Sequence, residues 1–292
     1  MASSPLMSSE ATPVSAQADH ILLNERVKLF STSSTSRRRL RQTTISVEVL
    51  IVAIGVWWIL SVVKVFPSYA LPDPPAVWTS FISLLNHGFG GTTFAADLSA
   101  SLYRIALGFL LAAVIGIPIG LAMGRVRWVF EVVDPFLEFF RPVPPLAYIP
   151  LLVVWFGIGE SPKVILIAAG TMPIIMINAL SGVRSIPPVR LRVAQSLGAT
   201  KWQRFYRVIL PSALPEIFTG LRVANGVAWT CLVAAELVAA NSGLGWLVEA
   251  AGQNLQVAIV IVGIIFIGAC GYATELIVRL LERIFVPWKG KS

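Results

Sequence analysis

Three strongly apolar windows of this chain, each about twenty residues long, contain no Asp, Glu, Lys or Arg. They are residues 105–123, 164–183 and 255–274. About 20 consecutive apolar residues are enough for a helix to cross the hydrocarbon core of a bilayer. A helix also satisfies its own backbone polar groups there, which an open sheet does not. The sequence therefore predicts an all-α integral membrane protein.

The composition agrees with a membrane location. Of the 292 residues 56% are hydrophobic and only 13% are charged, and the mean hydropathy is +0.77, which is too apolar for a soluble domain of this size. The two cysteines, Cys231 and Cys270, both lie in apolar runs. Neither a disulfide framework nor a thiolate metal site is expected from them, and no metal site is predicted elsewhere.

Three further passages bring the predicted number of spans to six. Residues 47–66 form the first, and residues 214–240, which contain Arg222 and Glu236, form the fifth. The third, residues 132–159, is interrupted by several prolines, which a span tolerates where neighbouring helices or a wet cavity satisfy the freed carbonyls. The expected layout is a disordered tail over residues 1–44, a membrane domain over residues 45–285 and a short tail over residues 286–292.

The distribution of Lys and Arg predicts the orientation. Most of these cations fall in the N-terminal tail, in the second and fourth connections and at the C-terminal end, whereas Lys64, Arg104 and Lys163 fall on the other side. By the positive-inside rule both termini are cytoplasmic. Residues 74–89 are then expected to form an interfacial helix on the outer side.

The fourth connection, residues 187–211, has the pattern of two short helices. Gly198 suits the left-handed cap that ends the first helix. Thr200 and Gln203 fit a capping box that starts the second, and Pro211 is expected to stop it. The second helix would place one apolar face toward the protein, formed by Trp202, Phe205, Tyr206 and Ile209.

Three interpretations of this helical pair compete. It could be an interfacial loop whose aromatic residues lie among lipid headgroups, a helix-turn-helix that binds DNA, or a docking element for a cytoplasmic motor protein. The connection is too short to hold the third helix and independent core of a DNA-binding domain, so no nucleic-acid partner is expected.

The same residues resemble the EAA motif of the membrane subunits of ATP-binding-cassette importers. The matching positions are Ala194, Gly198, Val208, Leu210 and Pro211. Arg192 stands where the motif has Glu and Val193 where it has Ala, so the salt bridge that such a Glu would make to the ATPase is not expected here. Residues 141–160, 214–240 and 243–248 resemble the permeases for taurine, aliphatic sulfonates, nitrate and bicarbonate, and the terminal VPWKGKS resembles the taurine members most.

This resemblance implies a type I (MetI-like) importer permease in a bacterial inner membrane. Its partners would be two ATPase subunits, an extracytoplasmic solute-binding protein, membrane lipid and a second permease copy, identical or closely related. The cargo would be a small anionic or zwitterionic solute, with taurine or another alkanesulfonate ranked before nitrate or bicarbonate. The ATPase-coupling residues would be Arg192, Val193, Ala194, Gly198, Thr200, Trp202, Leu210 and Pro211.

Energy is expected to come from another chain. Gly290, Lys291 and Ser292 match the end of a phosphate-binding loop, but Phe285 stands where its first Gly should be, and no helix follows. The chain is therefore predicted not to be an enzyme and to bind no cofactor, with ATP and Mg used by the partner ATPase. The alternative is a secondary transporter, which an inverted repeat and several buried carboxylates would favour; the sequence shows no convincing half-chain repeat.

Four polar residues are candidates for lining the translocation pathway. An acid facing lipid would cost ~3 kcal/mol, so Glu236 must face protein or water, either bonded to a neighbouring helix, in the pathway or in a proton relay. Asn178 and Asn225 suit hydrogen bonds between helices or contacts with cargo. Arg104 is expected at the outer mouth of its span, where it could attract an anion or extend toward the headgroups.

Overall fold

The computed structural model describes residues 48–49, 51–65, 67 and 70–289, and the chain divides into two units, Met1–Phe66 and Pro67–Ser292. In the first unit Ile51–Val62 is a short apolar helix. The predicted tail over residues 1–44 lies outside the described residues. Because the described helix is shorter than the ~20 residues of a full span, a first span over residues 47–66 stays a prediction.

The second unit is built from helices, and its described residues contain no β-structure beyond one isolated bridge, Phe89 with Thr92. In chain order the elements are α2 (Pro74–His87), α3 (Phe94–Arg125), α4 (Arg127–Phe140), η1 (Pro145–Tyr148), α5 (Ile149–Phe156), α6 (Glu160–Arg184), α7 (Pro188–Ser196), α8 (Lys201–Arg204), the π-helical turn η2 (Phe205–Ile209), α9 (Leu210–Ala239), α10 (Leu244–Gln253) and α11 (Val257–Phe285). The helix expected over residues 74–89 is confirmed as α2, whose first turn is capped by the Asp73 side chain.

Four helices of this unit are long and apolar enough to cross a membrane: α3, α6, the continuous stretch Lys201–Ala239 and α11. A fifth passage is a bent pair, Arg127–Phe140 with Pro145–Phe156, whose parts meet at 94°. This pair is the proline-interrupted passage expected from the sequence. Pro142, Pro144 and Pro145 lie at or beside the break, where their missing N–H groups and their rings prevent a continuous helix.

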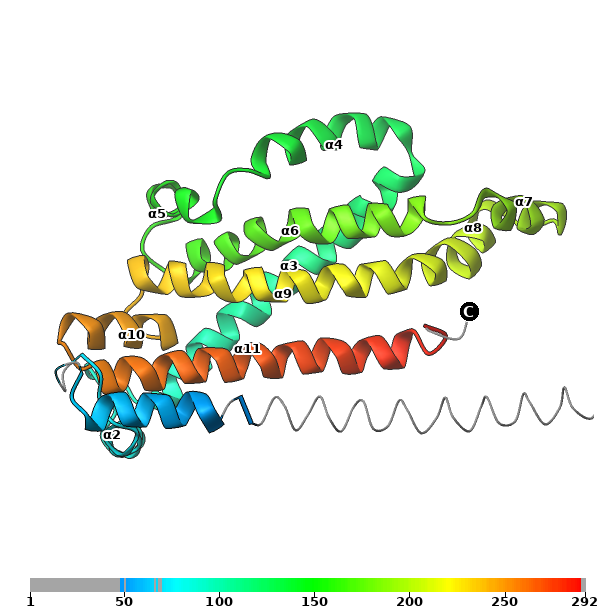
Figure 1. The fold of residues 1–292 in the computed structure, drawn as a ribbon. Coiled ribbons are helices and arrows are strands. Elements are labelled where there is room, and N and C mark those ends of the chain that lie inside the picture. The colour runs from blue at the N-terminus through cyan, green and yellow to red at the C-terminus, as the bar shows by residue number, and fades with distance from the viewer. Residues whose placement is uncertain (1–47, 50, 66, 68–69, 290–292) are drawn as a thin grey trace, which may run out of the picture. The chain divides into compact units, whose positions relative to one another are not determined.

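The centre of the unit is a layer of three helices, because α3 packs on α6 and α6 packs on α9 (Figure 1). Along α3 every fourth residue of the contact is small: Gly108, Ala112, Gly116, Gly120 and Gly124. Small residues at this spacing lie on one face and let two helix backbones approach closely. A Cβ at Gly108 would lie 2.6 Å from Cβ of Ile167 on α6, so this approach depends on the missing side chain.

Three features differ from the sequence-based expectations. Pro211 does not end a helix: η2 passes directly into α9, with the Leu210 N–H donating to the Phe205 carbonyl, and Pro211 occupies the first turn of α9, where a missing N–H is tolerated. Helix α10 was not expected at all, since a ten-residue helix is too short to give a spanning signal.

The third difference is the length of α11, which continues past the charge-free window to Phe285. Its extra turns carry Glu275 and Glu282, which pair with Arg222 of α9 at 3.3 Å and 3.9 Å. Glu275 also pairs with Arg279 one turn later at 2.7 Å, and Glu282 pairs with Lys289. The helix therefore continues past the apolar window, where Glu275, Arg279 and Glu282 each pair with an opposite charge.

The second unit has two distinct ends (Figure 1). The helices α7 and α8, with the residues that join them, form an elbow at one end. At the opposite end lie α10, α2 and α5, together with the start of α6. The two candidate functional regions described next occupy these two ends.

Candidate functional site

The elbow is built by local hydrogen bonds, as its sequence predicts. Gly198 has φ +76°, the left-handed conformation that favours glycine, and the Ala199 N–H donates to the Ala194 carbonyl at 3.0 Å. Thr200 and Gln203 form the predicted capping box, with the Thr200 N–H donating to Gln203 Oε1 at 2.9 Å and the Gln203 N–H donating to Thr200 Oγ1 at 3.3 Å. The turn is therefore stiff and its shape is specified by these residues.

The four side chains predicted to form one apolar face of the second elbow helix do not all face the same way in the structure. Ile209 is buried at 2% exposure, and Phe205 packs against the core formed by α3, α6 and α9. Trp202 and Tyr206 instead stack on each other, with ring centroids 5.9 Å apart, and point to the surface. The extra residue of the π-helical turn η2 changes which side chains share a face, and the expectation of a single 3.6-residue period missed this.

The result is an exposed apolar strip on the elbow. It comprises Val189, Val193, Leu197, Trp202 and Tyr206, with exposed fractions from 52% to 81%. The cations Arg190, Arg192, Lys201 and Arg207 are exposed beside it. Exposed large apolar side chains gathered on one element and accompanied by charge are typical of an interaction surface. Of the other residues predicted for coupling, Gly198 and Thr200 are exposed, and Ala194, Leu210 and Pro211 are half-buried.

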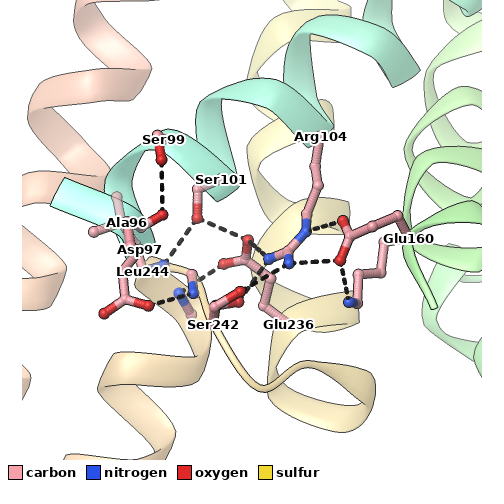
Figure 2. Close-up of polar contacts among 12 residues, drawn as sticks. Ala96, Asp97, Ser99, Ser101, Arg104, Glu160, Glu236, Ser242 and Leu244 are labelled. Atoms are coloured by element: carbon pink, nitrogen blue, oxygen red, sulfur yellow. Dashed lines mark hydrogen bonds and ion pairs between the residues drawn. The ribbon is translucent and has the colours of Figure 1, made fainter. Parts of the chain in front are cut away.

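At the opposite end, Arg104 of α3 is the centre of a buried ion cluster (Figure 2). Its guanidinium donates to both carboxylate oxygens of Glu160, at 2.6 Å and 2.8 Å, and to Glu236 Oε1 at 2.8 Å. The remaining donors reach the carbonyl of Ser242 at 2.6 Å and its hydroxyl at 3.2 Å. The Arg104 side chain is 2% exposed and that of Glu236 is fully buried. Lys163 also binds Glu160, at 2.9 Å.

Glu236 and Asp97 hold the connection between α9 and α10 in place. Ser101 donates to Glu236 Oε1 at 2.7 Å and accepts the Leu244 N–H at 2.8 Å, and the Gly245 N–H donates to Glu236 Oε2 at 2.8 Å. Asp97 accepts the Gly243 N–H at 2.9 Å. These contacts join α3, α6, α9 and the start of α10, so the cluster is a tie between helices at the end opposite the elbow.

The sequence indicated only part of this cluster. Glu236 and Arg104 were candidates because each is a charge in an apolar neighbourhood, but their pairing joins positions 132 residues apart and has no local signature. Asp97, Ser101 and Lys163 were not singled out; all three are buried. In this single chain Glu236 and Arg104 contact protein groups, and a direct role in a translocation pathway stays a prediction for both.

The other two pathway candidates border separate cavities. Asn178 lines a cavity of about 410 Å3 between the broken passage, α6 and α9. Asn225 lines one of about 490 Å3 between α9 and α11, and its side chain donates to the Gly271 carbonyl at 3.3 Å. Among the described residues no group of three or more His, Cys, Asp or Glu is arranged to hold a metal ion.

Comparison with known proteins identifies the family to which this chain belongs. The family model described as "binding-protein-dependent transport system inner membrane component" matches residues 114–285. The chain belongs to this family. It is the membrane permease subunit of an importer, and it works with a separate ATPase chain and a solute-binding protein, so the expectation that the chain is a transport subunit and not an enzyme is confirmed.

The permease has similar relatives along almost its whole length. It is 44% identical to the taurine transport system permease protein of Escherichia coli (strain K12), over 93% of this chain and 98% of the relative. It is 38% identical to a putative aliphatic sulfonates transport permease protein of Bacillus subtilis (strain 168), over 82% and 85%, and 31% identical to a nitrate import permease protein of Synechocystis sp., over 76% and 82%.

Solved structures confirm the predicted fold class. A chain of the MetNI methionine ABC transporter, crystallised in inward facing conformations, superimposes with a TM-score of 0.52 at 21% identity, over 69% of this permease and 97% of that chain. A chain of an amino acid ABC transporter with histidines gives 0.54 at 17% identity, over 72% and 96%. At these identities the likeness shows the fold alone, which is the all-α type I importer permease fold.

Proposed function

We propose that this permease imports taurine or another alkanesulfonate. The observation that carries the choice of cargo is the 44% identity with a taurine permease along nearly the full length of both chains, followed by the 38% identity with a putative sulfonate permease. The nitrate import permease at 31% identity makes a small inorganic oxyanion the second candidate. All three solutes carry a compact oxyanion group.

The elbow is the proposed docking site of the ATPase. Its exposed apolar strip, with Val193 and Trp202, offers area to bury, and Arg192 beside it offers charge. The arm is also stiff, because Thr200 and Gln203 cap α8 and α8 continues through η2 into the 30 residues of α9. A movement applied to α8 would therefore be carried along α9, and rigid-body rocking of two such subunits gives alternating access.

The proposed assembly contains two permease copies, two ATPase subunits and one external solute-binding protein, in contact with membrane lipid. In this arrangement both termini and the elbow face the cytoplasm, and the ion cluster of Arg104 and Glu236 lies near the outer face. Docking of the two ATPase subunits would include Ala194, Gly198, Leu210 and Pro211, the positions that match the EAA motif. ATP and Mg would be bound and used by the ATPase subunits.

A deletion strain tests the cargo. Loss of the permease should abolish growth on taurine as the sole sulfur source, and the restored gene should recover it. Unimpaired taurine uptake in the deletion strain would remove taurine from the proposal. A growth defect on nitrate as the sole nitrogen source, with normal growth on taurine, would support the second candidate instead.

Two elbow substitutions test the docking site in the reconstituted complex. Gly198→Pro destroys the left-handed cap, and Ala194→Glu places a charge in the docking surface; each should abolish uptake and the cargo-stimulated ATPase rate while the protein remains in the membrane. The matched control is Ala95→Glu, which changes an exposed alanine in the first turn of α3 at the opposite end. Full coupling in both elbow variants would contradict the docking proposal.

A further inference from the structure

A cavity of the second unit is lined by one arginine, Arg141. Arg141 follows α4 at the break of the bent passage, and it lines the cavity of about 410 Å3 between that passage, α6 and α9. Arg141 falls within the predicted third passage, residues 132–159. In the structure it lines the same cavity as Gly170 and Asn178 of α6 and Val227 of α9.

The position of the cavity along the helices shows its depth. Its α6 residues extend from Ala169 to Asn178, well inside a helix that runs from Glu160 to Arg184. Its α9 residues, Val223 and Val227, lie near the middle of a 30-residue helix. At about 1.5 Å per residue, Val227 is roughly 18–25 Å from either end of α9. The cavity therefore opens beside the interior of two spanning helices.

Arg141 differs from Arg104 and Arg222, which lie in spanning helices, in what surrounds it. Arg222 of α9 pairs with Glu275 and Glu282 of α11. Arg104 is 2% exposed and pairs with Glu160 and Glu236. The guanidinium of Arg141 has no hydrogen-bond or ion-pair partner among the described residues, and Arg141 is an exposed residue that lines the cavity. An unpaired charge at membrane depth is costly and normally faces water or a ligand, which makes it a candidate for function.

The remaining polar groups of the cavity suit a small anion. The Asn178 amide donates to the Ile174 carbonyl at 2.8 Å, which leaves one N–H free to donate again. The phenol of Tyr148 is a further donor, and Phe140 and Val227 are apolar. No Asp or Glu lines the cavity among the described residues. A few convergent donors in an otherwise apolar cavity are typical of a binding site for a small molecule.

Glycines allow the helices to pack closely around this cavity. A Cβ at Gly170 would lie 3.1 Å from Cγ of Pro145 and 2.6 Å from Sγ of Cys231, so a side chain there would push the broken passage away from α6. A Cβ at Gly220 of α9 would lie 2.9 Å from Cγ of Asn178. The positions of Asn178 and of the Pro145 turn thus depend on close packing around the cavity.

We propose that Arg141 is an anion-binding residue of the translocation pathway. Its guanidinium would hold the oxyanion group of the passing cargo, while Asn178 and Tyr148 donate hydrogen bonds. A guanidinium presents its N–H groups in the planar fork that matches two oxygens of a sulfonate or a similar oxyanion. The choice of a sulfonate rests on the proposed function; the anionic class of the ligand rests on the cavity itself.

Charge-dependent labelling tests the site without using cargo. The full complex in nanodiscs would carry Val227→Cys in the cavity, with Cys231 and Cys270 replaced by Ala. Rates would be measured for 2-sulfonatoethyl methanethiosulfonate, whose charged group is an ethanesulfonate, and for its trimethylammonium counterpart. The ratio of anionic to cationic rate should fall about fivefold or more in Arg141→Gln and stay within about twofold in Arg141→Lys. An unchanged ratio in Arg141→Gln overturns the proposal.

Two controls separate a local effect from a general one. Arg127→Gln removes the same charge from α4 at a side chain that is 91% exposed and paired with Glu131, and it should leave the ratio unchanged. Ser99→Cys, exposed in α3 at the opposite end, should react with a ratio that Arg141→Gln does not alter. A ratio that falls equally at Ser99→Cys would show a distant effect of charge and would contradict the site.

Uptake by the reconstituted importer links the site to transport. Arg141→Gln should lower taurine uptake about tenfold or more, Arg141→Lys should recover most of it, and Arg127→Gln should stay within about twofold. Uptake by Arg141→Gln within twofold of the unaltered permease overturns the pathway role, as does equal loss in Arg141→Lys and Arg141→Gln. Failure of the unaltered permease to import any alkanesulfonate would contradict the proposed cargo alone, because the labelling ratio decides the anion site by itself.

Discussion

Glu236 and Arg104 stabilise each other at a place where either charge alone would be unfavourable. Both side chains are almost fully excluded from solvent, and the carboxylate of Glu236 accepts from Arg104, Ser101 and the Gly245 N–H. Removing one partner of a buried pair leaves the other charge without compensation. The pair therefore holds α3 and α9 together at the end of the permease that lies opposite the elbow.

Glu236→Ala should therefore lower the free energy of unfolding by about 3–5 kcal/mol. The measurement is thermal unfolding of the purified permease in detergent, with the fraction of monodisperse protein monitored as the temperature rises. Glu131→Gln is the control, because Glu131 pairs with Arg127 on an exposed surface and such pairs contribute about 0–1 kcal/mol. Equal shifts for the two variants would show that the buried cluster does not stabilise the fold.

Gly243 is a second residue on which the cluster depends. Its φ is +123°, and a Cβ there would lie 2.5 Å from Cδ of Glu236 and 2.7 Å from Nη1 of Arg104. Gly243→Ala should thus combine backbone strain of about 1–3 kcal/mol with displacement of the ion pair. Gly91→Ala is the matched control, because Gly91 has φ +87° and open space where a Cβ would lie. This variant should show the backbone strain without displacement of the ion pair. Melting curves of the two variants measure these costs. A smaller loss of stability in Gly243→Ala than in Gly91→Ala would contradict the prediction.

Among the elements, α3 and α6 are joined by the small residues of α3. The repeat from Gly108 to Gly124 is visible in the sequence, but a stripe of small residues does not identify the helix it faces. The structure shows that the stripe faces α6, where Ile167 and Val183 occupy the space that side chains on α3 would need. Close backbone approach replaces the hydrophobic effect as the source of attraction within a membrane.

Gly108→Ala should separate α3 from α6. The new Cβ would lie 2.6 Å from Cβ of Ile167 and 2.9 Å from the Val164 carbonyl oxygen, and overpacking of this kind costs about 1–3 kcal/mol. Gly268→Ala of α11 meets no atom within 4 Å and should be neutral or stabilising by up to about 1 kcal/mol. The thermal stability of both variants in the same detergent checks the prediction. Equal stabilities of Gly108→Ala and Gly268→Ala would exclude a tight contact at Gly108.

The elements that the sequence predicts correctly are those with local causes. The apolar windows, the Gly198 turn and the capping box of Thr200 with Gln203 all depend on neighbours in the chain, and the structure contains each of them. The continuation of the helix through Pro211 was missed because a π-helical turn rearranges the hydrogen bonds that precede it.

At the scale of the whole molecule, the missed features are contacts between distant segments. The cluster joins Ser101 to Glu236 and Asp97 to Gly243, more than 130 residues apart in each case. The cavity lined by Arg141 was also missed, because it lies between the third passage, which bends by 94°, and the distant helices α6 and α9. Local patterns predict helices and their ends, whereas pairing and cavities are set by how the helices pack.

The orientation of the permease is the last prediction. The positive-inside rule places the elbow in the cytoplasm and the α10 end outside. In a background with Cys231 and Cys270 replaced by Ala, Leu197→Cys on the elbow, where Leu197 is 81% exposed, should resist a membrane-impermeant thiol reagent in intact cells and react after permeabilisation. Ser99→Cys at the opposite end should react in both conditions. Labelling of Leu197→Cys in intact cells would place the elbow outside, where no ATPase could reach it, and would contradict the coupling proposal as a whole.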